Sequence, residues 1–247
     1  MQREPLVACV MLTKDRPELA WRAIECFRAQ TYKHRTLLIW NTGTSEEIEC
    51  GCGSLCFHAV APDEGLTIGA LRNAANAFRT GYGVPDILIH WDDDDWSHPN
   101  RIAEQVALLQ NSRADVVGYN EMLFWRSVLD SRGHPGEAWL YRKRSNTYAL
   151  GTSLCYWRRV WEAKKFPDLP RPGAGAASED REWSQGLNVR AVSSLVVPYE
   201  KPDGPRMIAR IHGANSTPYN IEQTIEDGGT GWSRAKEWDE RVREILK

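Results

Sequence analysis

The sequence predicts an α/β fold in which a mainly parallel, Rossmann-like sheet carries helices on both faces, followed by a smaller mixed half. Three observations predict it. The 247 residues suit one large domain that buries a sizeable core without a disulfide or metal. Short apolar runs alternate with segments of helical period over the first 110 or so residues. Beyond that point the alternation stops and paired strands are expected.

The first half reads as four strands separated by helices. Leu6–Leu12 is a continuous apolar run, and Asp15, Pro17 and Glu18 form a helix start signal after it. Pro99 stands where a later helix would take its first-turn proline. The expected strands are residues 6–12, 36–40, 55–60 and 87–91, and the expected helices begin near residues 15, 67 and 99.

The second half is less regular. A polar stretch with glycine and proline, 131–148, and the Pro/Gly/Ala segment 167–177 are expected to be loops, the latter a flexible lid. The other expected elements are strands at 114–119, 122–125, 191–197 and 207–211, and helices at 158–165, from 178, and from 232 as an amphipathic tail. We therefore divide the single domain into a first half of nucleotide-binding type (1–112), a second half (113–217) and a C-terminal tail with the amphipathic helix (218–247).

Composition excludes several classes of protein. With 42% apolar and 26% charged residues the chain matches ordinary globular proteins, which excludes disorder as its main state. Its 31 basic and 33 acidic residues leave a net charge of −2, so no chain-wide basic field for nucleic acid exists. No stretch approaches the roughly 18–20 apolar residues of a membrane span, and the first apolar run is too short for a signal peptide. A cytoplasmic protein is expected.

Six cysteines are present, and reduced thiols are expected in that compartment. Cys50, Cys52, Cys56 and His58 offer soft ligands, but their spacing differs from the paired C-x2-C of common zinc folds. The spacing favours a Gly-rich turn over a zinc site, which stays open as the alternative.

The strongest chemical signal is the run Asp92–Asp95, directly after an expected buried strand. Four adjacent carboxylates repel one another unless a cation or solvent neutralises them. Oxygen ligands at the carboxyl end of a parallel strand favour Mg²⁺ or Mn²⁺ shared with substrate phosphates. The alternative is a solvated acidic turn before a helix.

Five segments in order resemble family-2 glycosyltransferases of the GT-A fold, from about residue 6 to 217. They are Thr13–Pro17, Gly65–Asn73, Asp92–Pro99, Glu179–Asp180 and Arg210–Thr217. The resemblance implies a single GT-A-type domain and a nucleotide-sugar donor with Mn²⁺ or Mg²⁺ on its diphosphate. It also implies displacement at the anomeric carbon with inversion, onto a hydroxyl of an acceptor that we leave open among glycan, lipid-linked and protein. The resemblance implies further that the first half also binds the metal and that the second half binds the acceptor and carries the catalytic base.

The resemblance also assigns residues. Asp180, the second member of the acid pair, matches the catalytic base, although Ser178–Asp180 is also an ordinary helix start. Asp94 is expected to be the main metal ligand, with Asp95 and His212. The D-x-D signature fits Asp92 and Asp94 or Asp93 and Asp95 equally well. The expected donor-binding residues are Thr13, Asp15, Asn41, Arg72, Asp92 and Asp93; a solvent-facing Arg72 and a purely structural His212 are the alternatives.

Two departures from the family pattern matter. Asn41 stands where the family carries a base-reading Asp, and it replaces a pure acceptor with a mixed donor and acceptor, so UDP is favoured as the nucleotide but not fixed. The Q-x-x-R-W motif of processive synthases is missing, which favours transfer of a single sugar.

Other interpretations compete with this one. A sugar nucleotidyltransferase would carry a glycine-rich phosphate loop near its start, whereas residues 12–16 have no glycine. A non-catalytic nucleotide- or carbohydrate-binding relative is the other alternative. The basic cluster Arg142–Arg144 could meet an anionic acceptor or the donor phosphates, or it could be merely solvated.

Overall fold

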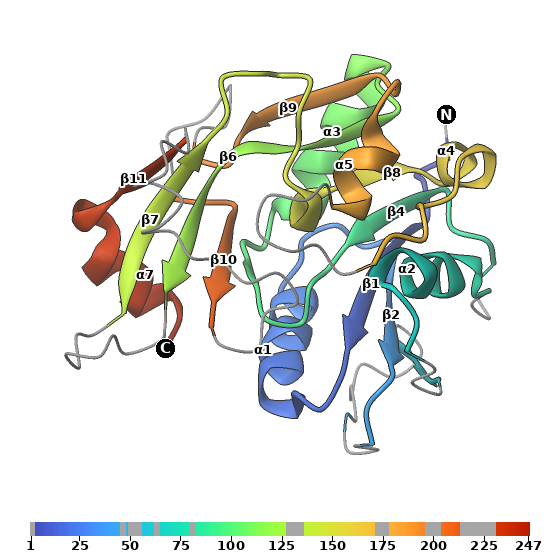
Figure 1. The fold of residues 1–247 in the computed structure, drawn as a ribbon, viewed down its shortest axis with the longest axis horizontal. Helices are drawn as coiled ribbons and strands as arrows, with labels where there is room; N and C mark the ends of the chain where they lie inside the picture. Colours follow the sequence, from blue (N-terminus) through green and yellow to red (C-terminus); the bar gives the residue numbers. More distant parts are fainter. Residues whose placement is uncertain are drawn as a thin grey trace.

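The computed structural model forms one mixed sheet with helices on both faces (Figure 1). It describes residues 3–44, 48, 56–61, 65–79, 83–126, 136–170, 178–195, 204–212 and 231–247. The strand order is β11-β7-β6-β8-β4-β1-β2-β3, with β10 beside β5 and β6, and β9 beside β6. The expected α/β architecture is therefore confirmed.

The first half follows the predicted alternation closely. Its strands β1, β2, β3 and β4 are all parallel, and β1 lies between β2 and β4. The elements are β1 (Val7–Thr13), α1 (Pro17–Arg28), β2 (Arg35–Asn41), β3 (Cys56–Val60), α2 (Ile68–Ala77), β4 (Ile87–His90), β5 (Trp96–Ser97) and α3 (Arg101–Ser112).

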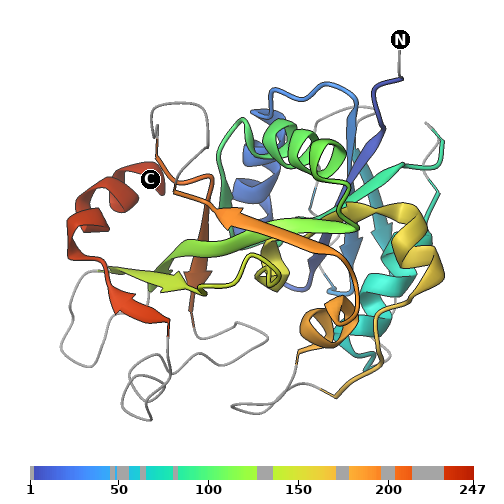
Figure 2. The same cartoon turned by 90° about the horizontal axis from the view of Figure 1, so that it is seen from above.

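Alternating side chains of the central strands pack into two separate cores. Val7, Cys9 and Met11 of β1 face α1 and α3, whereas Ala8 and Val10 face the opposite layer. That layer consists of α2, α4 (Arg158–Ala163) and α5 (Glu179–Ser184). Figure 2 shows the two groups of helices on opposite sides of the sheet. Strands buried on both faces explain why these segments are continuous apolar runs.

One long strand, β6 (Val116–Arg126), organises the second half. The two paired strands expected at 114–119 and 122–125 are wrong: Asn120 and Glu121 continue the same strand across an irregularity in its pairing with β9 (Val189–Ser193). The first part of β6 pairs with β8 (Cys155–Trp157) and β9, and its last part pairs with β7 (Glu137–Arg142) and β10 (Met207–Ile211). The polar residues Asn120 and Glu121 resemble a turn in the sequence, but here they lie within a strand that has neighbouring strands on both sides.

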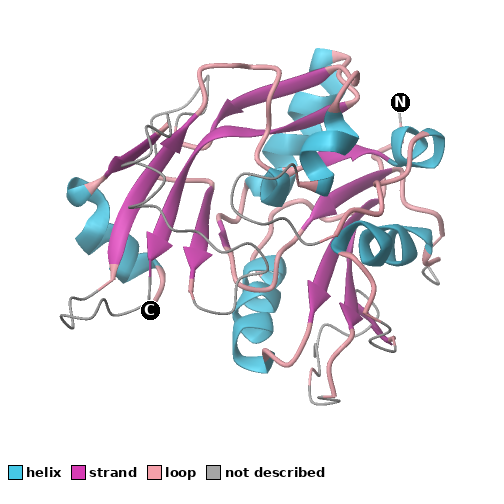
Figure 3. Cartoon of the chain, viewed as in Figure 1, coloured by secondary structure: helices cyan, strands magenta, loops and turns pink. Residues whose placement is uncertain are grey.

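Further expectations fail in this half. Residues 137–142 form β7, although a loop was predicted over 131–148, because Trp139 and Leu140 pair with Phe124 and Leu123 of β6. The tail does not begin as a helix at residue 232: β11 (Trp232–Arg234) pairs with β7 before η3 (Lys236–Trp238) and α7 (Asp239–Ile245) (Figure 3). The predicted lid lies largely outside the described residues.

Helix α1 begins at Pro17 as predicted, but its expected cap is different. Arg16 holds the cap position without a side-chain hydrogen bond to the helix. Asp15 instead has φ +50° and its carboxylate accepts hydrogen bonds from Thr44. Asp15 therefore connects the loops after β1 and β2 and does not cap the helix.

The thiols differ from one another. Cys9, Cys26 and Cys155 are free, as expected, whereas Cys56 is disulfide-bonded, so the expectation of reduced thiols is wrong at this position. Cys50 and Cys52 lie outside the described residues. Disulfides are rare in the cytosol, so this bond counts against the expected cytoplasmic placement, which stays a prediction. Over the described ranges, no helix is long and apolar enough to cross a membrane.

Candidate active site

The carboxyl ends of the parallel strands bring the predicted donor-binding residues to one edge of the sheet. Thr13 ends β1 and Asn41 ends β2, and the two residues are partners in the strand register. The acidic run follows directly after β4, which neighbours β1. In open α/β sheets this edge is where ligands bind.

The loops after β1 and β2 hold each other in place. The Thr44 amide donates to Asp15 Oδ1 over 2.8 Å, and the Gly43 amide donates to Asn41 Oδ1 over 2.8 Å. A Cβ at Gly43 would lie 2.5 Å from the Asp15 amide nitrogen, so only glycine permits this approach. Asp15 and Asn41 thus define a rigid corner at the expected nucleotide side of the edge.

Burial alternates along the acidic run. Asp93 and Asp95 are buried, whereas Asp92 and Asp94 are half-buried. Asp93 accepts a hydrogen bond from Thr13 Oγ1 at 2.7 Å and forms an ion pair with Arg16 at 2.7 Å. Burial raises the pKa of Asp93 to about 7, although Arg16 opposes the rise. The alternation separates Asp93 and Asp95, which are buried, from Asp92 and Asp94, which stay partly exposed.

Asp94 meets the predicted C-terminal histidine. His212 Nε2 lies 3.0 Å from Asp94 Oδ2, and Arg16 Nη1 lies 3.2 Å from the same oxygen. His212 follows β10, which pairs antiparallel with β5 directly after the acidic run. This pairing explains how residues 118 positions apart meet.

Asp95 joins three parts of the chain. Its Oδ2 accepts a hydrogen bond from Thr152 Oγ1 at 2.5 Å, and its Oδ1 accepts one from the Arg210 amide at 3.1 Å. Burial and the neighbouring carboxylates raise its pKa well above the usual range. Asp95 therefore fixes β10 and the 3₁₀ turn η2 (Gly151–Ser153) against the acidic run.

Arg101 of α3 holds the backbone around the acidic run in place. Its fully buried guanidinium donates to Ser97 Oγ, the His90 carbonyl and the Thr152 carbonyl, at 2.8, 2.8 and 3.2 Å. It also lies 5.0 Å from the ring centroid of Trp91. One side chain thus connects the residues on either side of the acidic run to η2.

Arg72 connects the acidic run to the acid pair. This α2 residue is buried, which excludes the solvent-facing alternative, and its guanidinium lies 3.7 Å from Asp92, 3.5 Å from Glu179 and 3.7 Å from Asp180. Burial of the guanidinium opposes ionisation, yet these carboxylates hold the Arg72 pKa above its usual range. Arg72 Nη1 and Asp180 Oδ1 are both buried without a hydrogen-bond partner among the described residues. Such atoms indicate a position for a polar ligand.

Asp180 lies in the first turn of α5, whose N-cap is Ser178 as predicted. Burial raises the pKa of Asp180 to about 8, and the nearby Glu179 and Asp92 add to the rise while Arg72 opposes it. A carboxyl group with this pKa is suited to accept a proton near neutral pH.

A buried polar chain lies beside Asp180. His90 Nδ1 is 2.7 Å from the Gly151 carbonyl and 3.6 Å from Asp180 Oδ1. His90 Nε2 is 3.3 Å from the Tyr156 hydroxyl, which also accepts a hydrogen bond from Asn76. Burial lowers the pKa of His90 well below its usual range, so the ring is neutral. A Cβ at Gly151 would overlap the Asp180 carboxylate.

Arg16 thus bridges Asp93 and Asp94, which in turn contact Thr13 and His212. Arg72 bridges Asp92 and Asp180. Sequence reasoning gave no role to Arg16, His90, Arg101 or Thr152. Arg16 lies within a segment that was already singled out, but the other three are recognisable only from three-dimensional contacts.

The donor set fits one divalent cation shared with a substrate. Within the described part of the chain, no group of three or more His, Cys, Asp or Glu side chains forms a closed metal site. Asp94 and His212 supply one carboxylate and one imidazole, which suit Mn²⁺ or Mg²⁺ that keeps positions for phosphate and water.

Comparison with known proteins finds the same fold in solved structures. The fold is similar to that of S. aureus TarS residues 1–349 in complex with UDP-GlcNAc, with TM-score 0.60, 12% identity and coverage of 85% of this chain and 60% of that one. It is also similar to the mannosyltransferase PcManGT from Pyrobaculum calidifontis in complex with GDP-Man and Mn²⁺, with TM-score 0.56, 12% identity and coverage of 81% and 59%. The chain thus spans about 60% of the length of these proteins.

No curated protein sequence matches the chain. The family model described as Glycosyl transferase family 2 matches residues 8–155, which include β1, the acidic run and η2. That span is more than half of the chain, and it contains most of the residues that build the site. The protein therefore belongs to glycosyl transferase family 2 and has a GT-A fold.

Proposed function

We propose that this glycosyltransferase moves one sugar from a UDP-sugar to an acceptor hydroxyl, with inversion and with help from a divalent cation. The observation that carries the proposal is the pair of contacts made by Arg72, which holds Asp92 of the acidic run and Asp180 in one site. A donor carried by the acidic run would thereby lie next to a carboxyl group whose pKa suits a base.

Asp94 and His212 are the proposed metal ligands. A cation between them would replace their present 3.0 Å contact and would stabilise the negative charge on the departing diphosphate. The alternating burial favours Asp92 and Asp94 as the D-x-D pair, since both side chains are more exposed than those of Asp93 and Asp95. Asp93 and Asp95 already accept hydrogen bonds from buried protein groups, so we assign them to positioning the run.

Asp180 is the proposed base. As the acceptor oxygen forms its bond to the anomeric carbon, its proton passes to Asp180, and the bond from that carbon to the diphosphate breaks with its electron pair leaving on the diphosphate. Attack from the side opposite the leaving group inverts the anomeric configuration. Asp180 Oδ1, buried without a hydrogen-bond partner among the described residues, is the atom that would receive the hydroxyl.

The proposed nucleotide side is the corner made by Thr13, Asp15 and Asn41. The complex of TarS with UDP-GlcNAc supports a UDP-sugar, whereas the complex of PcManGT with GDP-Man shows that the fold also takes a guanine nucleotide. We further propose that residues 1–112 bind the donor and the metal, and that residues 113–217 bind the acceptor and carry the catalytic base. Residues 218–247 form the C-terminal tail, in which Trp232–Arg234 pair with β7.

Calorimetric titration with UDP, GDP, CDP and dTDP, each with Mn²⁺ and again with excess chelator, tests the proposal. We expect UDP to bind selectively and only with the metal. Asp94→Ala should lose this binding, and Asp180→Ala should keep it while losing transfer. Equal affinity with and without chelator would refute the metal-dependent part, and a fully active Asp180→Ala variant would refute the base.

A further inference from the structure

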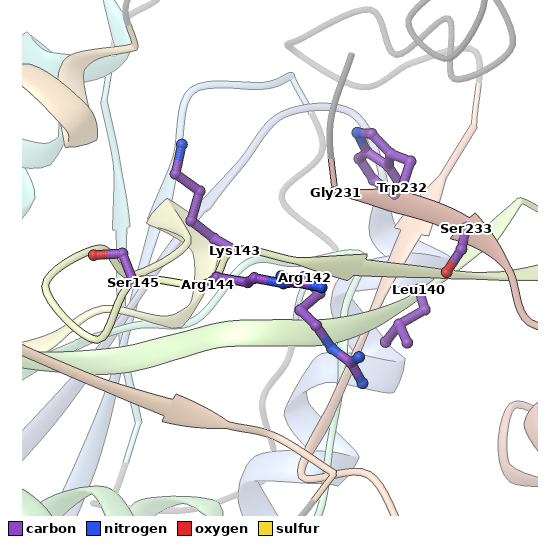
Figure 4. A pocket seen from close by; sticks show the side chains of 8 residues that line it. All are labelled: Leu140, Arg142, Lys143, Arg144, Ser145, Gly231, Trp232 and Ser233. Carbon is purple, nitrogen blue, oxygen red and sulfur yellow. The ribbon is translucent and has the colours of Figure 1, made fainter. Parts of the chain in front are cut away.

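A cavity of 690 Å³ lies where β7 ends beside β11 (Figure 4). Arg142, Lys143 and Arg144 line it from the end of β7, and Trp232 and Ser233 line it from β11. Among the described residues that line it, none is acidic. The cavity therefore combines a concentrated positive charge with an aromatic side chain.

The three cations differ in how they are paired. Arg142 forms an ion pair with Glu121 of β6 through two of its nitrogens, so its charge is largely compensated. Lys143 and Arg144 are exposed, and neither has a carboxylate partner within the described part of the chain. Lys143 instead lies 5.5 Å from the ring centroid of Tyr148. These two side chains supply the uncompensated positive charge.

An aromatic surface adjoins these cations. Trp232 lies 5.0 Å from Tyr141 and 4.7 Å from Phe124, measured between ring centroids, and it is half-buried. Figure 4 shows the Trp232 and Lys143 side chains on the same side of the β7 ribbon and Arg142 on the other side. A half-buried indole offers a flat apolar face of the kind on which sugar rings stack.

The aromatic surface lies within electrostatic range of the helix that carries the proposed base. Burial raises the pKa of Tyr141, while a hydrogen bond with Tyr148 and the charge of Arg181 oppose the rise. Arg181 follows Asp180 in α5. An extended acceptor, bound at the cavity by one end, is the kind of molecule that would bridge to Asp180.

We propose that the cavity at the β7–β11 edge is an acceptor subsite for an anionic saccharide, in which Trp232 stacks against a sugar ring and Lys143 and Arg144 bind its carboxylate or phosphate groups. The proposal rests on the proposed function, because it names the acceptor class of the same enzyme. Guanidinium and ammonium groups bind both carboxylate and phosphate, so the experiment below determines which of these two anions the saccharide carries.

The test measures binding of three oligosaccharides to the full chain: oligogalacturonate, pentamannose phosphate and neutral maltopentaose, with inorganic phosphate as a bare anion. The variants are Trp232→Leu and the double variant Lys143→Gln/Arg144→Gln. The matched control is Lys33→Gln/Lys247→Gln, which removes the same charge from exposed positions elsewhere. Circular dichroism verifies folding, and UDP binding with Mn²⁺ is measured for every variant.

We expect at least one anionic oligosaccharide to bind about tenfold more tightly than maltopentaose and than phosphate alone, with affinity falling as salt rises. The double variant should lose about tenfold in affinity for it and the control less than about twofold, and Trp232→Leu should weaken it too. UDP binding should be unchanged in all of them. Preference for the carboxylate or the phosphate probe identifies the anion.

Equal binding of maltopentaose, no binding of any probe, or equal losses in the double variant and the control would overturn the subsite. If the wild-type protein does not bind UDP, the proposed donor is overturned, whichever oligosaccharides bind. The two failures are therefore distinguishable.

Discussion

The raised pKa of Asp180 predicts a pH dependence of catalysis that can be worked out from the structure. Asp180 must be ionised to accept a proton, and its pKa is about 8. The ionised fraction is then about one tenth at pH 7 and about one hundredth at pH 6, so kcat/KM should rise about tenfold per pH unit below pH 8 and level off above it.

Removal of the carboxylate should abolish the pH-dependent limb. Asp180→Asn keeps the size of the side chain and should lower turnover by about 10²–10⁴-fold, the usual contribution of a general base. In an enzyme that keeps Asp180, Arg72→Gln should shift the rising part of the pH profile to higher pH, because the Arg72 charge opposes the rise in the Asp180 pKa. Glu182→Gln on the same helix is the control, since it removes the same negative charge at a residue that accepts a hydrogen bond from Gln185.

The assay follows release of UDP from UDP-GlcNAc, with water as acceptor, between pH 6 and 9. Donor affinity is measured in parallel by calorimetry, so that loss of binding is not mistaken for loss of chemistry. A flat wild-type profile over this range, or an Asp180→Asn variant as active as Glu182→Gln, would refute the assignment.

Four further outcomes are expected. Asp94→Asn should weaken Mn²⁺-dependent UDP binding by more than the ~10–100-fold typical of groups behind a metal ligand, as calorimetry would measure. Arg101→Met should lower the free energy of unfolding in urea by about 3 kcal/mol, because it leaves several buried acceptors without a donor. Gly151→Ala should reduce turnover but not UDP binding, since the new methyl group displaces the Asp180 carboxylate. Without metal, the free energy of unfolding should fall as pH rises from about 4 towards 8. The reason is that the folded-state pKa values of Asp93 and Asp180 lie near 7 and 8, above the usual 3.8, so folding favours the protonated carboxyls. Urea unfolding at several pH values measures this, and a flat or rising trend would contradict it.

Much of the first half was predictable because its signals are local. Continuous apolar runs predicted β1, β2 and β4, and helical spacing predicted α2 and α3, each within a few residues of its observed bounds. The acidic run was placed correctly after β4 for the same reason. Predictions failed where pairing across the chain decides the structure, as for β7 and β11, two short segments without a clear period that become strands beside β6 and each other.

The sequence by itself determined the α/β class, the resemblance to the family and the residue types available for chemistry. It did not determine which carboxylates are buried, because Asp92–Asp95 are chemically identical until Thr13, Arg16, Thr152 and the Arg210 amide engage Asp93 and Asp95. That difference comes from the folded chain. Burial and charge pairing are properties of groups distant in sequence, and the same packing that buries Asp180 beside Arg72 raises its pKa into the range of a base.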